Sequence, residues 1–280
     1  MPDRMTQITR PLARLLPVCA ALLLISAAHA QAPSSVFLEE LTWTELRAAI
    51  DAGDTTAIVP IGGTEQNGPT IVLGKHNERV RFLAGKIART LGNAIVAPVV
   101  SYVPEGRIDP PADHMRFAGT LSIPDEVFQR TLEYAARSLR VHGFRDIVLL
   151  GDHGGYQRDL EPVAGKLNRE WARSPARVHA VTEYYRASTQ GFAALLRERG
   201  YREEEIGTHA ALADTSLMMA IDPAAVRTDL LQSGAALGPA QGVHGDPRRA
   251  SAQLGQLGVE QIVSATVAAI QARVARRAPR

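Results

Sequence analysis

The sequence predicts a single three-layer α/β/α domain with a mostly parallel sheet. The strand-like segments are continuous apolar runs, which is the pattern of strands buried on both faces of a parallel sheet. Segments with helical periodicity separate these runs, as the crossover helices of such a sheet must. The roughly 250 residues after residue 30 contain no repeat and no long charge run, so they suit one domain.

In the first half of the domain, apolar residues at helical spacing predict helices, and short β-branched or apolar runs predict strands. In chain order we expect a helix from Thr42, a strand over residues 56–61, a helix over 77–91, a strand over 94–102 and a helix over 124–142. Gly62 and Gly63 end the first strand, and Gly143 follows the third helix, where a glycine commonly ends such an element.

The second half continues the alternation. We expect strands over residues 146–150 and 177–183, and helices over 157–173, 192–198, 214–220 and 260–276. The run at 146–150 is the most hydrophobic of the strands, and Gly-Asp-His-Gly-Gly follows it at once. Ligand sites in parallel sheets form outside the carboxyl ends of strands, so the residues just after strands are the first candidates for chemistry.

Residues 1–30 have the organisation of a secretory signal peptide. Three arginines precede an apolar run over residues 15–25, and Ala28-His29-Ala30 is a small-x-small cleavage site. A retained membrane anchor is the alternative, but the apolar run is shorter than the roughly 20 residues that span a bilayer. We therefore expect cleavage near Ala30, a mature hydrolytic domain over residues 31–280 and a periplasmic or secreted protein.

Composition excludes two classes of partner. Removing the three arginines and one aspartate of residues 1–30 from the 31 basic and 29 acidic residues of the chain leaves 28 of each. A net charge near zero offers no basic surface, so we expect no nucleic-acid partner and, after processing, no membrane partner. The single cysteine, Cys19, lies in the predicted leader, so any metal in the mature chain must be held by N and O ligands.

Three side chains supply the ligand set of a catalytic zinc site: Glu65, His76 and His153. Glu65 and His153 each follow a predicted strand, so they can meet at one edge of the sheet. Two imidazoles and one carboxylate leave a fourth position open for a water molecule, whose pKa zinc lowers towards roughly 7. The alternatives are a capping or salt-bridge carboxylate for Glu65, a solvated loop residue for His76 and a backbone-bonded turn residue for His153.

Five sequence blocks resemble the creatininase (creatinine amidohydrolase) family, in family order over nearly the whole mature chain. Pro60-Ile-Gly-Gly-Thr-Glu65-Gln-Asn-Gly-Pro resembles its Pro-x-Gly-Ser-x-Glu-Gln-His-Gly-Pro, and Gly151-Asp-His153-Gly-Gly-Tyr resembles its Asn-Gly-His-Gly-Gly-Asn. The other three blocks begin at His114, His209 and Gly242. The resemblance implies a creatininase-like fold and a homo-oligomer, often a hexamer.

The resemblance also implies two metal ions, but this chain departs from that pattern. Family members hold one ion with a Glu, a bridging Asp and a His. These three positions match Glu65, His76 and His153, in that order. The second ion uses a His where this chain has Asn67, the same bridging Asp, and a Glu that matches Gly155 or Asp214. Because the bridging Asp is replaced by His76, and a neutral imidazole cannot bridge two ions, we expect about one Zn²⁺ per chain, with Mn²⁺ as the alternative.

His209 and Asp214 are the candidate catalytic residues. His209 matches a family position near the scissile bond, which implies a general acid or base; the alternative is a helix-start histidine satisfied by backbone. Asp214 is a candidate fourth metal ligand, a partner of a ligand, or the base for the bound water, with a helix N-terminal carboxylate as the alternative. His114 lies in a loop rich in Pro, Gly and Asp, where we expect a solvated position, with a wall of the pocket or a subunit contact as the alternatives.

The sequence therefore predicts an exported, metal-dependent amidohydrolase that cleaves an open-chain or cyclic amide C–N bond of a small molecule with a zinc-bound water. Creatinine is disfavoured as the substrate. Creatininase covers the creatinine ring with tryptophans near the segment that matches the one beginning at His209, whereas in this chain Trp43 and Trp171 are both far from His209 in sequence. The alternative is a non-catalytic family member that binds a small molecule, with a structural metal at most. The altered ligand positions favour that alternative, and the retained Glu65, His153 and His209 oppose it.

Overall fold

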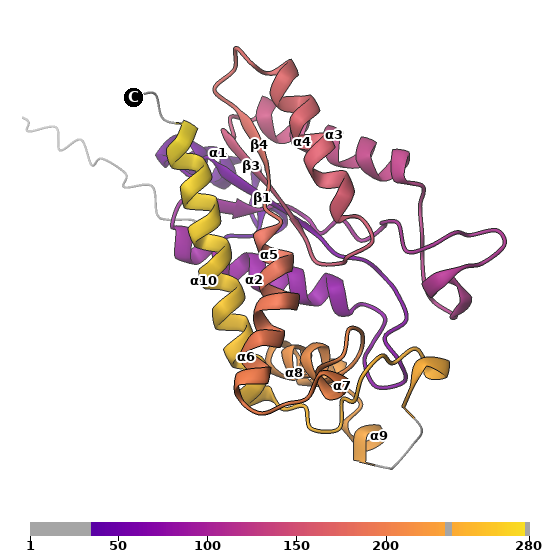
Figure 1. Ribbon diagram of the computed structural model, residues 1–280. Coiled ribbons are helices and arrows are strands. Elements are labelled where there is room, and N and C mark those ends of the chain that lie inside the picture. Colours follow the sequence, from indigo (N-terminus) through magenta and orange to yellow (C-terminus); the bar gives the residue numbers. More distant parts are fainter. Residues whose placement is uncertain (1–34, 233–236, 278–280) are drawn as a thin grey trace, which may run out of the picture. The chain divides into compact units, whose positions relative to one another are not determined.

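The structure, a computed structural model, describes residues 35–232 and 237–277, so the predicted leader lies outside the described residues. Four parallel strands form a sheet in the order β2-β1-β3-β4 (Figure 1). They are β1 (Thr56–Ile61), β2 (Ala94–Val96), β3 (Asp146–Gly151) and β4 (Arg177–Ala180). Every residue of β1 and β3 is buried, which is why both read as continuous apolar runs. The predicted parallel sheet is confirmed.

Helices surround the sheet. In chain order they are α1 (Trp43–Ala52), α2 (Lys75–Leu91), α3 (Asp125–Val141), α4 (Gln157–Glu170), α5 (Glu183–Arg186), α6 (Phe192–Glu198), α7 (Glu203–Ile206), α8 (Leu212–Ile221), α9 (Thr228–Gln232) and α10 (Ala252–Arg277). A π-helical turn, Ala187–Gly191, joins α5 to α6, and a 3₁₀ turn, Asp113–Arg116, lies in the loop between β2 and α3. Within the described ranges, no helix is long and apolar enough to cross a membrane.

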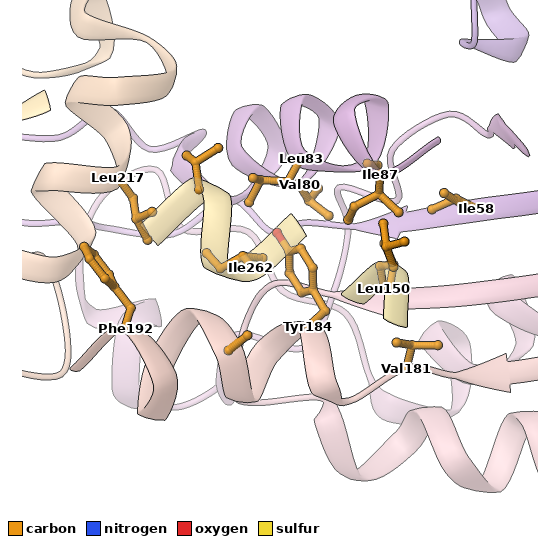
Figure 2. Packing of buried hydrophobic residues seen from close by; sticks show 14 of the residues in the cluster. Ile58, Val80, Leu83, Ile87, Leu150, Val181, Tyr184, Phe192, Leu217 and Ile262 are labelled. Carbon is orange, nitrogen blue, oxygen red and sulfur yellow. The ribbon is translucent and has the colours of Figure 1, made fainter. Parts of the chain in front are cut away.

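Two separate cores on the faces of the sheet make the fold three-layered, as predicted. Figure 2 shows the first core, where Val80, Leu83 and Ile87 of α2 pack with Ile58 and Leu150 of the sheet. The second core joins the alternate residues of the same strands to α3 and α4: Val59, Ile147, Leu149, Phe128, Leu132, Leu160 and Val163. Successive residues of each strand therefore enter opposite cores, as the period of a strand requires.

Several predicted boundaries are wrong, among them the end of α4, which lies at Glu170 rather than at residue 173. The β2 strand ends at Val96 rather than at residue 102, because Pro98 has no N–H to donate to the ladder. The β4 strand ends at Ala180 rather than at residue 183, since Glu183 already begins α5. Helix α2 begins at Lys75 rather than at residue 77, which places two further side chains in its first turn, and α10 begins at residue 252 rather than 260.

The early part of α10 depends on a close approach to α8. A Cβ added at Gly255 would lie 1.8 Å from the Ser216 carbonyl oxygen, so Gly255→Ala must push the two helices apart and should lower the free energy of unfolding by roughly 1–3 kcal/mol. Gly165→Ala, in α4, meets only the Arg169 guanidinium at 3.4 Å and should be neutral or stabilise by up to about 1 kcal/mol. Urea unfolding measures both variants; equal effects would contradict the packing argument.

Candidate metal centre

The loops that follow β1 and β3 leave the sheet side by side, because Ile61 pairs with Gly151 in the parallel ladder. A buried tyrosine ties the two loops together. The Tyr156 hydroxyl lies 2.7 Å from the Ile61 carbonyl oxygen, and the His153 N–H donates to that hydroxyl at 3.0 Å. Glu65 and His153 consequently meet at the carboxyl ends of the two central strands.

A carboxylate oxygen and two imidazole nitrogens converge beside these loops. Glu65 Oε2 lies 3.3 Å from His153 Nε2 and 3.3 Å from His114 Nε2, and the ligand atoms of the three residues lie within 4.8 Å of one another. Glu65 is fully buried, and its Oε2 accepts no hydrogen bond from the described residues. A buried carboxylate oxygen without a donor, faced by two imidazoles, is a donor set that fits one divalent metal ion.

The surroundings hold all three side chains in the protonation state that binds a metal. Burial alone would raise the pKa of Glu65, but Lys75, His76 and His153 hold that pKa well below its usual range. Burial lowers the pKa of His153 and of His114, and this effect outweighs the opposing charge of Glu65. At neutral pH the site therefore offers one carboxylate and two uncharged imidazoles.

His114 is the candidate ligand that sequence reasoning missed. The expectation of a solvated loop position is wrong, because the 3₁₀ turn Asp113–Arg116 brings His114 to the cavity wall and to Glu65. The Gln66 amide nitrogen lies 3.1 Å from His114 Nδ1 and helps to orient the ring. One signal was available in the sequence: His114 opens a family-like block within a loop, and such a block is a reason to look for chemistry there.

Glu105 contacts the other nitrogen of His153 and was also missed. Its Oε2 lies 3.2 Å from His153 Nδ1. Burial and the nearby charge of Glu65 raise the pKa of Glu105 to about 10, so it is a neutral carboxylic acid at pH 7. Gly63 leaves room for it, since a Cβ there would lie 2.2 Å from Glu105 Oε1. Neither oxygen of Glu105 makes a hydrogen bond within the described residues, and His153 Nδ1 accepts one from the Gly155 N–H at 3.2 Å. Glu105 therefore packs beside the His153 ring, and no motif in the sequence pointed to it.

His76 lies beside the cluster, in the first turn of α2, with both ring nitrogens facing carboxylates. Its Nε2 lies 2.7 Å from Glu65 Oε1, and its Nδ1 lies 2.6 Å from Asp152 Oδ2. Burial opposes the ionisation of Asp152, but Arg79 and His76 hold its pKa below the usual value. The His76 ring would have to give up one of these contacts to reach an ion at Glu65 Oε2. Its predicted role as a ligand therefore stays a prediction.

Asp214 and His209, the predicted catalytic residues, border the same cavity. Asp214 Oδ1 accepts a hydrogen bond from Arg79 Nη1 at 2.6 Å, and Oδ2 accepts one from Lys75 Nζ at 3.3 Å. Burial would raise the pKa of Asp214, but these two cations hold it well below the usual range. Burial and the charge of Lys75 lower the pKa of His209 to about 3, so its ring is uncharged at pH 7. Both catalytic roles, and Asp214 as a ligand, stay predictions.

A cavity of about 290 Å³ opens onto the cluster. Its wall includes Lys75, His76, His114, Asp152, His153, Tyr185, Thr189, His209 and Asp214. A second cavity, also of about 290 Å³, shares four of these residues and continues past the π-helical turn to Ile206. Neither Trp43 nor Trp171 lines these two cavities. The candidate ion site therefore faces a polar space of the size that takes a small molecule.

Fold and donor set together define the class: an α/β protein with a parallel sheet and a candidate His/Glu metal site at the carboxyl ends of its central strands. A family model described as Creatininase (creatinine amidohydrolase) matches residues 39–270. The chain therefore belongs to the creatininase family, as its motifs predict.

Three relatives carry different names. Creatinine amidohydrolase of Pseudomonas putida is 30% identical over 131 residues, which are 47% of this chain and 49% of that protein. The 3-dehydro-scyllo-inosose hydrolase of Thermotoga maritima is 27% identical over 192 residues, 68% of this chain and 58% of that protein. Mycofactocin precursor peptide peptidase of Mycobacterium tuberculosis is 26% identical over 251 residues, 79% of this chain and 85% of that protein. The chain thus spans about half the length of the first relative and less than two thirds of the second.

Solved creatininase structures share the fold. The structure described as creatininase Mn has a TM-score of 0.72 at 24% identity, over 86% of this chain and 99% of that one. A mutant creatininase of Zn-Zn type has a TM-score of 0.70 at 24% identity, over 86% of this chain and 98% of that one. The predicted creatininase-like α/β fold is confirmed.

Proposed function

We propose that this protein is a metal-dependent hydrolase that cleaves an amide C–N bond of a small molecule, with one divalent ion bound by Glu65, His114 and His153. The observation that carries the proposal is the buried Glu65 Oε2, which accepts no hydrogen bond from the described residues. His114 Nε2 and His153 Nε2 each lie 3.3 Å from this oxygen. Membership of the creatininase family supports hydrolysis, since the relatives are named an amidohydrolase, a hydrolase and a peptidase.

A divalent ion bound at this point would supply Lewis acidity, which lowers the pKa of a water molecule and polarises a carbonyl oxygen. The chain's own residues bind and orient the substrate. His209, with Nδ1 3.7 Å from Glu65 Oε1, presents an uncharged imidazole to the cavity wall, and its pKa of about 3 makes the ring a weak base. The Gly155 N–H donates to His153 Nδ1 at 3.2 Å and helps to keep the His153 ring in place. Asp214, held ionised by Lys75 and Arg79, presents a carboxylate to the same space.

The test measures metal content and hydrolysis on the same samples. Zinc and manganese are quantified by mass spectrometry, and turnover is assayed on creatinine, formamides, short peptides and 3-dehydro-scyllo-inosose. We expect about one ion per chain and turnover of at least one amide. A bound ion without turnover of any of these substrates would favour the non-catalytic binding protein. Turnover of 3-dehydro-scyllo-inosose alone, which has no amide bond, would contradict the amide assignment, and a protein without any bound ion would contradict the proposal as a whole.

The choice of ligands is tested by single substitutions. His114→Ala should lower zinc affinity by more than about 100-fold, because losing even an outer partner of a ligand costs about 10–100-fold. His244→Ala is the matched control: this histidine is exposed on the same cavity, its ring centroid lies 6.3 Å from that of His209, and affinity should not change. Competition against a chelator measures each variant. If His76→Ala loses the ion while His114→Ala keeps it, the ligand set predicted from the sequence is the correct one.

Export and assembly belong to the same proposal. We propose that the protein acts in the periplasm or outside the cell after cleavage near Ala30, as residues 1–30 predict, and that it works as a homo-oligomer, as the family resemblance implies. N-terminal sequencing of the native protein and its mass in solution test these two points. An uncleaved N-terminus would contradict the first, and a monomer would contradict the second.

A further inference from the structure

Lys75 is buried inside the candidate site. It begins α2 and is only 1% exposed, which is rare for a lysine without a specific partner. Its Nζ lies 3.4 Å from Glu65 Oε1 and 3.3 Å from Asp214 Oδ2. The Lys75 ammonium ion thus connects Glu65, in the loop after β1, to Asp214, in the first turn of α8.

The two oxygens of Glu65 face different partners. Oε2 faces His114 and His153, where the proposed ion lies, whereas Oε1 faces His76 Nε2 at 2.7 Å and Lys75 Nζ at 3.4 Å. Asp214 lies at one of the two positions from which the family pattern draws a ligand of the second ion. Lys75 Nζ therefore lies between Glu65, a ligand of the proposed ion, and a candidate ligand of a second one.

Three positions that the family pattern uses for a second ion do not offer its usual ligand here. The Asn67 side-chain nitrogen donates to the Glu65 and Val72 carbonyl oxygens at 2.9 and 3.1 Å, which ties the side chain to the local loop, and its Oδ1 accepts no hydrogen bond from the described residues. Gly155 has no side chain to offer, and both nitrogens of His76 already face carboxylates. The carboxylates of Glu65 and Asp214 remain as donors for a second ion, but Lys75 Nζ lies between them, so the two-ion pattern that the family resemblance implies disagrees with this chain.

Charge leads to the same conclusion. An ammonium ion and a divalent ion a few ångströms apart inside a protein repel each other strongly, so both cannot occupy the space between Glu65 and Asp214. We propose that the Lys75 ammonium ion takes the place of the second metal ion, so that the protein binds a single divalent ion per chain. This inference rests on the proposed one-ion site at Glu65, His114 and His153.

The test is the number of zinc ions per full-length chain. Zinc titration calorimetry and metal analysis, with all variants prepared identically, should give one ion for the parent and two for Lys75→Ala, which removes the ammonium ion from between the two carboxylates. Lys75→Arg keeps the positive charge and should stay at one ion. Lys86→Ala removes an exposed lysine from the same helix and should also stay at one.

Each outcome decides between the two proposals. A parent that already binds two ions, or a folded Lys75→Ala variant that stays at one, overturns this inference and leaves a hydrolytic metal site in place. A parent that binds none overturns the proposed function, and this inference falls with it. Circular dichroism checks folding; if Lys75→Ala does not fold, Lys75→Gln keeps a polar side chain beside both carboxylates without the charge, and the same second ion is expected.

Discussion

Replacing Glu65 with glutamine is expected to remove the bound metal ion and hydrolysis together. The substitution keeps the size of the side chain but removes the negative charge that faces both imidazoles at 3.3 Å. It also leaves Lys75, 3.4 Å from the other oxygen, beside a neutral amide. We expect zinc affinity to fall by more than about 100-fold, because removing a residue that only hydrogen-bonds to a metal ligand already costs about 10–100-fold, and Glu65 is proposed as a ligand itself. Chelator competition and the amide assay measure the two effects on one sample.

Glu78→Gln is the matched control for that experiment. Glu78 is exposed in the first turn of α2, so the same chemical change there should alter neither metal content nor turnover. Retention of the parent affinity by Glu65→Gln would show that Glu65 is not a ligand, and it would remove the main support for the proposed site.

Replacing Arg79 with methionine is expected to cause the largest loss of stability. Arg79 Nε donates to Asp152 Oδ2 at 2.8 Å, and Nη1 donates to Asp214 Oδ1 at 2.6 Å. Asp152 is fully buried, so removal of Arg79 leaves a buried carboxylate without its guanidinium partner. Breaking a buried ion pair from one side costs about 3–5 kcal/mol, and we expect the free energy of unfolding to fall by that amount.

Arg81→Met tests whether burial is the cause. Arg81 lies two positions further along α2 and pairs with Glu40 at 2.7 Å, but its side chain is 37% exposed. An exposed pair contributes about 0–1 kcal/mol, so this variant should unfold close to the parent in urea at pH 7. A difference of less than about 1 kcal/mol between Arg79→Met and Arg81→Met would contradict the role assigned to the buried network.

The sheet and its layers could be predicted from the sequence because their signals are local. Strands β1 and β3 are buried at every position, and a continuous apolar run records that burial directly. Helix α10 shows the limit of such reasoning. Its beginning depends on Gly255 packing against Ser216 of α8, a contact that periodicity within one segment cannot predict.

The candidate site was predictable only in part. Glu65 and His153 follow the central strands, and the parallel register brings such residues together in any sheet of this kind. Their position therefore follows from the topology alone. His114 and Glu105 come from the long loop before α3, whose path is set by what it packs against rather than by a repeating pattern.

By itself, then, the sequence determined the family, the parallel sheet and the edge of the sheet at which the chemistry gathers. Only the tertiary structure decided which side chains face one another there. Lys75 meets Asp214 across 139 residues of sequence, and His76 meets Asp152 across 76. The physical reason is that the partner of a buried charge is whichever opposite charge the fold brings within a few ångströms, and that distance is set by the packing of whole elements.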